Sequence, residues 1–242
     1  MNRGLDLAER DDPVTSREQD AVRILLLLNG AGELLKDAER ALPGLDTAVC
    51  VVRTTVRLQK LDFWLRNPDY LADELLNEYE TSQEEPLLRI ATSILDSEEP
   101  EVRRYPMLRN RFGAWENIDN ALAVLRGAGL AVRKRRGTVD RVRQSDYYLL
   151  EKGRAVACDI VATEPVFQYY VDRVELVIQL ADGLGGTQLK QRQYLQKEYA
   201  ETPLHEHIST VAPRARARLA ELQAAAGVKP ASTVVTTEGT AR

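Results

Sequence analysis

The sequence is poor in the residue types from which metal and redox sites are usually built. Its 242 residues include only two cysteines and two histidines. Cys50 and Cys158 lie far apart in apolar surroundings, which predicts two small buried side chains rather than a zinc or redox pair. His205 and His207 are separated by one residue, so a helix would point them to different faces, and the spacing matches no common metal constellation. We therefore expect no metal site.

Long apolar runs and phosphate-binding loops are also missing. Runs such as Ile24 to Leu28 are much shorter than the roughly 20 residues that span a bilayer, and the first residues lack the pattern of a secretion signal. The glycines between Gly183 and Lys190 lack the P-loop spacing and a preceding strand. Carboxylate pairs lie in polar hinges, where nothing would raise a pKa for general acid chemistry. These absences predict a soluble, cytoplasmic protein with no membrane partner, no cofactor and no enzymatic activity.

The charges that are present are unevenly distributed. The chain is 44% hydrophobic and 29% charged, enough for one large or two small domains, and its net charge is −4. From Asp69 to Glu101, eleven acidic residues and one basic residue give −10, whereas from Val102 to Gln144 eleven basic and three acidic residues give +8. This asymmetry favours either a local anionic partner or two solvated faces that partly neutralise each other.

Apolar periodicity predicts a mainly α-helical N-terminal part. After a flexible arm at 1–17, Ser16 and Gln19 can cap a first helix that stops at Asn29-Gly30. Further helices are expected over 33–42, 46–64 and 70–79. Short helices in this order are the skeleton of a helix-turn-helix domain, which we assign to residues 18–80.

The middle of the chain has the pattern of a second domain, over residues 86–162. Helices are expected over 87–95, 105–112 and 115–126, and Ile118, Leu122 and Leu125 form the inward face of the third. An extended segment, a charged turn containing Gly137 and a second extended segment follow. The predicted order is therefore three helices, a strand, a wing and a strand.

The C-terminal part is again helical, with helices expected over 166–180, 187–199 and 213–226. We assign residues 164–226 to an interaction region and residues 227–242 to a disordered tail. Its apolar residues exceed what isolated helices can bury among themselves, so Phe167, Tyr170, Val174 and Leu189 are predicted to bind a partner. The alternative is that these side chains close the core of the preceding domain.

The basic residues gather on the predicted wing and on the helix that precedes the third helix of the middle domain. In this arrangement they can contact the phosphates of double-stranded DNA, although a charged hairpin can also serve solubility alone. Asn117 and Asn120 could bond adenine edges, but Glu116 and Asp119 beside them would repel phosphate. The predicted nucleic-acid-binding residues are Arg103, Arg104, Arg109, Arg111, Asn117, Asn120, Arg133, Lys134, Arg135, Arg136, Arg141 and Arg143.

Two resemblances accompany these patterns. The element order, with LRGAGLAVRKR at Leu125 to Arg135 and YYLLEKGRAVA at Tyr147 to Ala157, resembles the winged-helix family, in which the third helix runs directly into a two-stranded wing. RILLLLNGAG at Arg23 to Gly32 and RLQKLDFWLRNPDYLADELL at Arg57 to Leu76 are similar to the middle subunits of bacterial three-component ABC/SMC-type ATPase defence systems, including the third subunit of Lamassu. The resemblances imply a tandem helix-turn-helix and winged-helix architecture with C-terminal helices.

Two functions fit these expectations. The first is a non-catalytic accessory subunit that contacts the DNA backbone and docks on a larger nucleic-acid-handling ATPase, in an anti-phage role. The second is a dimeric winged-helix transcriptional regulator, in which the C-terminal helices form the interface between two copies.

Overall fold

The computed structural model describes residues 16–97, 99, 103–110, 113–115, 117–138 and 142–227. The chain is mainly helical and divides into two compact units, each built from segments that are far apart in the sequence. Unit 1 consists of Met1–Asn67 and Arg103–Ser209, and unit 2 of Pro68–Val102 and Thr210–Arg242. Within the described residues, no helix combines the length and the apolar character that crossing a membrane requires.

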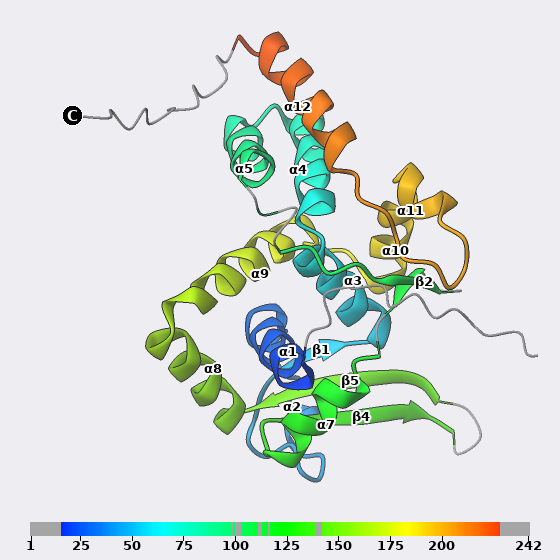
Figure 1. The fold of residues 1–242 in the computed structure, drawn as a ribbon. Coiled ribbons are helices and arrows are strands. Elements are labelled where there is room, and N and C mark those ends of the chain that lie inside the picture. Colours follow the sequence, from blue (N-terminus) through cyan, green and yellow to red (C-terminus); the bar gives the residue numbers. More distant parts are fainter. Residues whose placement is uncertain are drawn as a thin grey trace, which may run out of the picture. The chain divides into compact units, whose positions relative to one another are not determined.

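Unit 1 surrounds a small antiparallel sheet with helices (Figure 1). Its helices are α1 (Arg17–Ala31), α2 (Asp37–Arg40), α3 (Thr55–Arg66), α7 (Asp119–Gly127), α8 (Glu151–Thr163), α9 (Gln168–Leu180), α10 (Gly186–Tyr194) and α11 (Lys197–Glu201), with a 3-10 turn, η1 (Pro165–Phe167), before α9. Its strands are β1 (Ala48–Arg53), β2 (Leu108–Asn110), β3 (Gly113–Trp115), β4 (Ala131–Gly137) and β5 (Val142–Leu150).

Helix α1 is the central helix of unit 1. Its N-terminus has the expected capping box, in which the Ser16 hydroxyl accepts from the Gln19 amide at 3.1 Å and the Gln19 side chain accepts from the Ser16 amide at 2.8 Å. The helix packs against α7, α8, α9 and the sheet, and Figure 1 shows it between α9 and the strands. Because neighbours cover several sides, every side chain from Ile24 to Leu28 is buried.

The main sheet has the strand order β1-β5-β4, with both pairs antiparallel. Tyr147 in the central strand lies opposite Val52 on one side and Arg133 on the other. Helix α1 packs against β1 and β5. Leu35, Leu45, Ala48, Val51 and Tyr148 form a buried hydrophobic cluster. The segment that contains α2 therefore contributes side chains that pack on the sheet.

The prediction of a single helix over 46–64 is wrong, because its first part is strand β1. The valines of this segment are β-branched and favour extended backbone, and nearly continuous burial along β1 hides the alternation that marks a half-exposed strand. Thr54 then takes a positive φ of 65° and its hydroxyl accepts from the Arg57 amide at 3.1 Å, which starts α3.

The prediction of a helix over 105–112 is also wrong. Tyr105 precedes Pro106, which disfavours helical backbone at that position, and the chain instead forms β2, which pairs with β3. Gly113 adopts a φ of +101°, and a Cβ at this position would lie 2.7 Å from Lys60 Nζ. Since residues 113–115 are strand, α7 begins at Asp119 rather than at 115.

Unit 2 contains α4 (Pro68–Ser82), α5 (Glu85–Asp96) and α12 (Ala212–Ala225), which pack on one another. Asp73 of α4 accepts from Arg214 at 3.1 Å and from Arg218 at 3.2 Å, both on α12. Asp69 accepts from the Val211 amide at 2.9 Å, just before α12 begins. Part of the acidic stretch is therefore paired with the arginine-rich last helix.

The two units do not follow the boundaries that the sequence predicts. Helices α1 and α3 and strand β1, from the predicted 18–80 domain, lie in unit 1 with α7, β4 and β5 from the predicted 86–162 domain. Helix α5, expected as the first helix of the winged-helix module, belongs to unit 2 with α4 and α12. Most of the predicted arm and tail lies outside the described residues.

Candidate functional site

One face of hairpin β4–β5 carries Arg133 and Arg135 toward the side of α7. Arg133 lies opposite Tyr147 and Arg135 opposite Ser145 in the antiparallel ladder, so the two arginines share a face. The Arg133 guanidinium donates to Asp119 in the first turn of α7 at 2.7 Å. This ion pair neutralises one of the two carboxylates that argued against DNA contact by α7, and the other, Glu116, lies outside the described residues.

On the opposite face of the hairpin, the basic side chains form hydrogen bonds and ion pairs with other parts of unit 1. Lys134 donates to the Pro43 carbonyl at 2.7 Å, and Arg136 pairs with Glu39 at 2.6 Å and with Asp146 at 2.7 Å. These two basic residues therefore hold the α2 segment and β5 in place, which leaves them less able to contact phosphate than the sequence suggests.

Glu39 is the centre of this network. It is buried, and it also accepts from Arg53 at 2.7 and 2.9 Å and from the Tyr148 hydroxyl at 3.1 Å. The hydrogen bonds from Arg53 hold the pKa of Glu39 well below its usual range. Sequence reasoning missed Glu39 and Arg53, because their partners come from remote parts of the chain.

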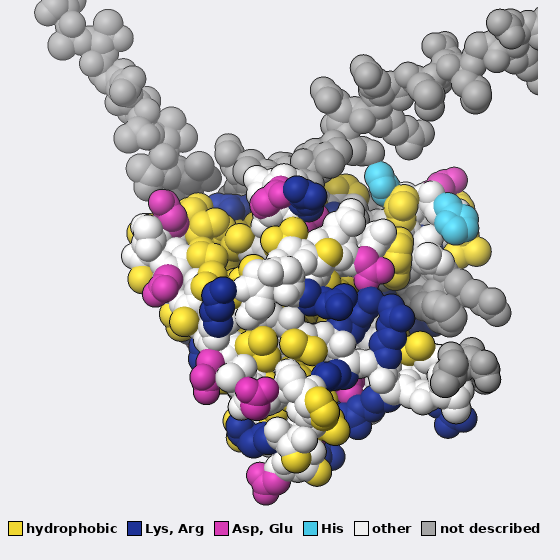
Figure 2. Space-filling model, turned by 90° about the horizontal axis from the view of Figure 1, so that it is seen from below, with side chains coloured by type: hydrophobic (Ala, Val, Ile, Leu, Met, Phe, Trp, Pro, Cys, Tyr) yellow, Lys and Arg dark blue, Asp and Glu magenta, His cyan; other side chains and the backbone are white. Residues whose placement is uncertain are grey.

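Among the described residues, Arg135 and Arg143 are the two predicted basic residues of hairpin β4–β5 that remain open. Both are exposed, and neither forms a hydrogen bond or ion pair with another described residue. Figure 2 looks at the chain from the side of α7 and β4, the lowest elements in Figure 1, and shows Lys and Arg side chains gathered on part of this face. Arg141, also predicted here, lies outside the described residues.

Helix α7 packs beside strand β4 of the hairpin. Ile118, just before the helix, and Ala121, Leu122 and Leu125 are buried, as the sequence predicts. Asn117 and Asn120 are exposed, and the Asn117 side chain accepts from the Asp119 amide at 3.1 Å. Asn120 therefore keeps its amide available, whereas Asn117 is engaged at the start of the helix.

The predicted basic residues that precede α7 have structural roles instead. Arg109 donates to the carbonyls of Tyr199 at 3.1 Å and Thr202 at 2.8 Å, at the C-terminal end of α11. Arg104 donates to the Ile208 carbonyl, and the Arg103 guanidinium lies 4.3 Å from the centre of the Tyr169 ring. The structure does not bring these side chains into the surface of the hairpin, and Arg111 lies outside the described residues.

The residues predicted to bind a partner separate into two pairs. Phe167 and Tyr170 are partly buried, with ring centroids 6.3 Å apart. Val174 is buried, and its Cγ1 lies so near Gly30 that a Cβ there would be 2.4 Å away. Leu189 is fully buried. The partner-surface prediction is therefore wrong for Leu189, whose side chain is part of the packed interior. Val174 is buried against Gly30 but also lines the groove between α1, α8 and α9.

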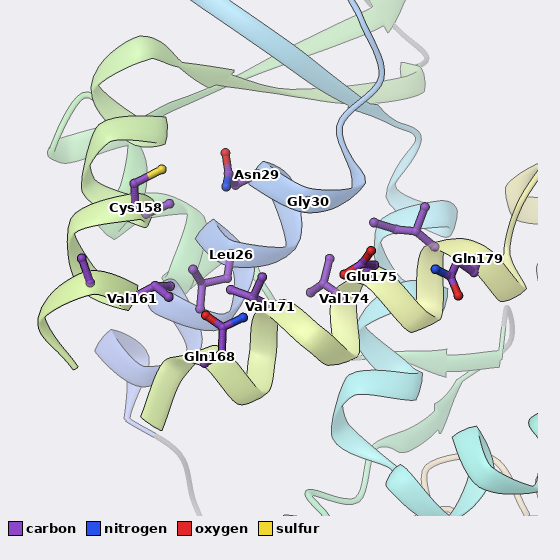
Figure 3. Close-up of a pocket in the computed structure, with 13 residues that line it drawn as sticks. Leu26, Asn29, Gly30, Cys158, Val161, Gln168, Val171, Val174, Glu175 and Gln179 are labelled. Atoms are coloured by element: carbon purple, nitrogen blue, oxygen red, sulfur yellow. The ribbon is translucent and has the colours of Figure 1, made fainter. Parts of the chain in front are cut away.

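A large apolar groove lies between α1, α8 and α9 (Figure 3). Its volume is about 820 Å³, and its walls are mostly apolar with amide side chains and Glu175 among them. Cys158, expected to be buried, is exposed and lines this groove, whereas Cys50 is buried. The helical spacing of Ala157, Cys158 and Val161 was the signal in the sequence for this side of the groove. The signal was overlooked because the segment was assigned to the end of the predicted winged-helix domain.

A buried polar cluster around Lys60 was also missed. Lys60 Nζ donates to the Ala114 carbonyl at 3.2 Å and to the Tyr199 hydroxyl at 3.1 Å, and that hydroxyl also accepts from the Ala114 amide at 2.5 Å. Burial lowers the pKa of Lys60 to about 7, with a contribution from the nearby charge of Lys190. These bonds join β3 to α3 and α11.

Comparison of the chain with family models, with curated proteins and with solved structures finds no significant match.

Proposed function

We propose that unit 1 is a winged helix interrupted by an insertion, and that it contacts the phosphate backbone of DNA without catalysing a reaction. The observation that carries this proposal is the element order α1, β1, α3, α7, β4 and β5 in one unit, with β5 central in the sheet. In this reading α1, α3 and α7 are the three helices and β4–β5 is the wing. Residues 68–118 are then inserted between the second and third helices.

The charges of α7 and the wing support contact with phosphates rather than reading of bases. Arg135 and Arg143 are exposed and unpaired among the described residues, and Arg133 neutralises Asp119 at the start of α7. Asn120 is the one exposed predicted side chain on α7 itself that could bond a base edge. Phosphate contacts position a protein on a duplex without specifying sequence, so weak, salt-dependent binding with little sequence preference is expected.

Fluorescence anisotropy with a labelled duplex tests the proposal. The double variant Arg135→Glu and Arg143→Glu should lose most of its affinity at low salt, and the slope of log K against log salt should fall by about 2, because each phosphate contact contributes close to one unit. The matched control is Arg89→Glu and Lys197→Glu, which changes the net charge equally at exposed positions outside the wing. Equal loss in both variants would contradict a role for the wing.

We further propose that the protein works as an accessory subunit on a larger nucleic-acid-handling ATPase, as in the defence systems that its sequence resembles. Purification of the tagged protein from its own host, followed by mass analysis and sedimentation, tests this step. A copurifying ATPase supports the subunit role. A homodimer without other proteins would instead support the transcriptional regulator.

A further inference from the structure

Unit 1 contains another pocket at the first turns of α1, and none of its lining residues lines the apolar groove or belongs to hairpin β4–β5. Its volume is about 380 Å³, which lies within the range of small-molecule sites. The pocket is lined by Glu18, Gln19, Val22, Arg23, Arg103, Tyr105, Val166, Phe167 and Tyr170. Its lining combines three aromatic rings with two arginines, which distinguishes it from the apolar groove.

The aromatic side chains form a supported wall. The rings of Phe167 and Tyr170 are inclined by 32°, and Tyr169 contacts Tyr170 edge to face at 5.2 Å. The backbone of Tyr105 is fixed by Arg66, whose carbonyl accepts from the Tyr105 amide at 2.8 Å and whose Nε donates to the Tyr105 carbonyl at 3.2 Å. Phe167, Tyr170 and Tyr105 are only partly buried. Partly exposed aromatic rings that line one pocket suit the stacking of a planar ring.

Arg23 supplies a buried donor to this pocket. Its side chain is 5% exposed, and it pairs through Nε with Asp62 at 2.7 Å and through Nη1 with Asp20 at 2.5 Å. Its Nη2 has no partner among the described residues, although buried donors are nearly always paired. Two carboxylates already balance the charge of Arg23. The partner that Nη2 still lacks is therefore a neutral acceptor, such as a carbonyl oxygen or a ring nitrogen, and not an anion.

Arg103 supplies a positive charge to the same pocket. Its guanidinium lies over the Tyr169 ring, and Arg173 lies over the same ring at 5.2 Å. No described carboxylate forms an ion pair with Arg103. Glu18 is the one carboxylate among the residues that line the pocket, and it is paired with Arg17 at 2.7 Å. An anionic group at this position would therefore meet a cation that has no other counterion in the described structure.

We propose that this pocket binds a nucleotide. The base stacks on the aromatic wall, an acceptor atom of the base accepts a hydrogen bond from Arg23 Nη2, and the phosphate pairs with Arg103. The ligand is a nucleotide unit, either free or as an unpaired unit of a strand. This site uses none of the residues of the wing or α7, so it stands independently of the proposed DNA-backbone contact.

Calorimetric titration of the full chain tests the proposal with AMP, GMP, CMP, UMP, the matching nucleosides, ribose 5-phosphate and a short single-stranded oligonucleotide. Arg103→Gln should weaken nucleotide binding by about tenfold and leave nucleoside binding unchanged. Tyr170→Leu should weaken both ligands, because it removes stacking area while retaining an apolar side chain. Lys197→Gln and Trp115→Leu change an exposed cation and an exposed aromatic ring outside the pocket and should change neither affinity.

The possible sources of the nucleotide give different results. Binding of mononucleotides supports a free ligand, and binding of the oligonucleotide alone, weakened by Tyr170→Leu, supports a strand. Oligonucleotide binding that depends only on Arg135 and Arg143 would overturn the pocket assignment while leaving the wing proposal intact. Equal affinity for ribose 5-phosphate and AMP, or no binding of any probe at millimolar concentration, would also overturn it. Arg23 is left unchanged because its ion pair with Asp62 is buried.

Discussion

The acidic stretch from Asp69 to Glu101 and the basic stretch from Val102 to Gln144 are adjacent in the sequence, but their charges are used differently. Acidic side chains of α4 pair with arginines of α12, within unit 2. Basic side chains of the second stretch are divided among carbonyl groups, the Glu39 network and exposed positions of hairpin β4–β5. A charge run in a sequence therefore does not predict a charged patch, because remote segments supply its counterions.

The two faces of hairpin β4–β5 show the same contrast on a smaller scale. Arg136 forms ion pairs with two buried carboxylates, whereas Arg135, its neighbour in the strand, has no partner among the described residues. Successive side chains of a strand point to opposite faces, so adjacent arginines meet different surroundings. Substitutions of the charged residues and of their partners in both regions measure how much the paired and the open side chains contribute to stability.

The largest effect is expected at Glu39. Glu39→Gln should lower the free energy of unfolding of unit 1 by about 2–3 kcal/mol, because it removes the buried charge that holds Arg53 and Arg136, both of which keep some contact with water. Urea titration followed by fluorescence measures this loss, since both tryptophans, Trp64 and Trp115, lie in unit 1. Glu33→Gln, at the exposed partner of the same Arg53, is the control and should cost under about 0.5 kcal/mol.

The same residue predicts a pH dependence. The folded pKa of Glu39 lies below its unfolded value, so its stabilisation is complete above the unfolded pKa of about 4.3 and is lost as pH falls below it. The wild-type protein should therefore lose more stability than Glu39→Gln between pH 6 and acidic pH. Parallel curves for the two proteins would show that Glu39 is not the group responsible.

A smaller effect is expected in unit 2. Asp73→Asn should destabilise the packing of α4 on α12 by about 1–2 kcal/mol, because the buried carboxylate accepts from both Arg214 and Arg218. Hydrogen exchange across residues 68–82 and 212–225 measures this change, which should leave the amides of α1 protected. Glu80→Gln, at the half-exposed partner of Arg218, is the control and should change exchange much less.

Local sequence signals correctly predicted the elements that depend on neighbouring residues. The capping box at Ser16, the buried face of α7 and the two paired strands β4 and β5 are confirmed by the structure. Strand β1 was missed because its burial comes from Leu35 and Leu45 as well as from the sheet, and this appears only when the α2 segment is in place. The division into units was missed because α12 is far from α4 in the sequence.

The nucleic-acid residues were predicted too broadly for the same physical reason. The sequence shows that Arg109 and Arg136 are basic. It does not show that Arg109 donates to a carbonyl of α11 or that Arg136 pairs with Glu39. Lys60 is a similar case, since its partners Ala114 and Tyr199 are 54 and 139 residues away along the chain. Charge type can be read from the sequence, whereas the availability of a charge depends on the fold.

The smallest effect on stability is expected at Arg135 and Arg143, the exposed basic residues of hairpin β4–β5, and this prediction separates a binding surface from a structural one. Arg135→Gln and Arg143→Gln should each change the free energy of unfolding by under about 0.5 kcal/mol, because exposed side chains without partners contribute little. Arg136→Gln should cost about 1 kcal/mol or more, since it leaves Asp146 buried with less compensation. Urea titration of the three variants under one condition gives the ranking. If Arg135→Gln destabilised unit 1 as much as Arg136→Gln, Arg135 would have a structural partner. Of the two open cations of hairpin β4–β5 among the described residues, Arg143 alone would then remain available to bind phosphate.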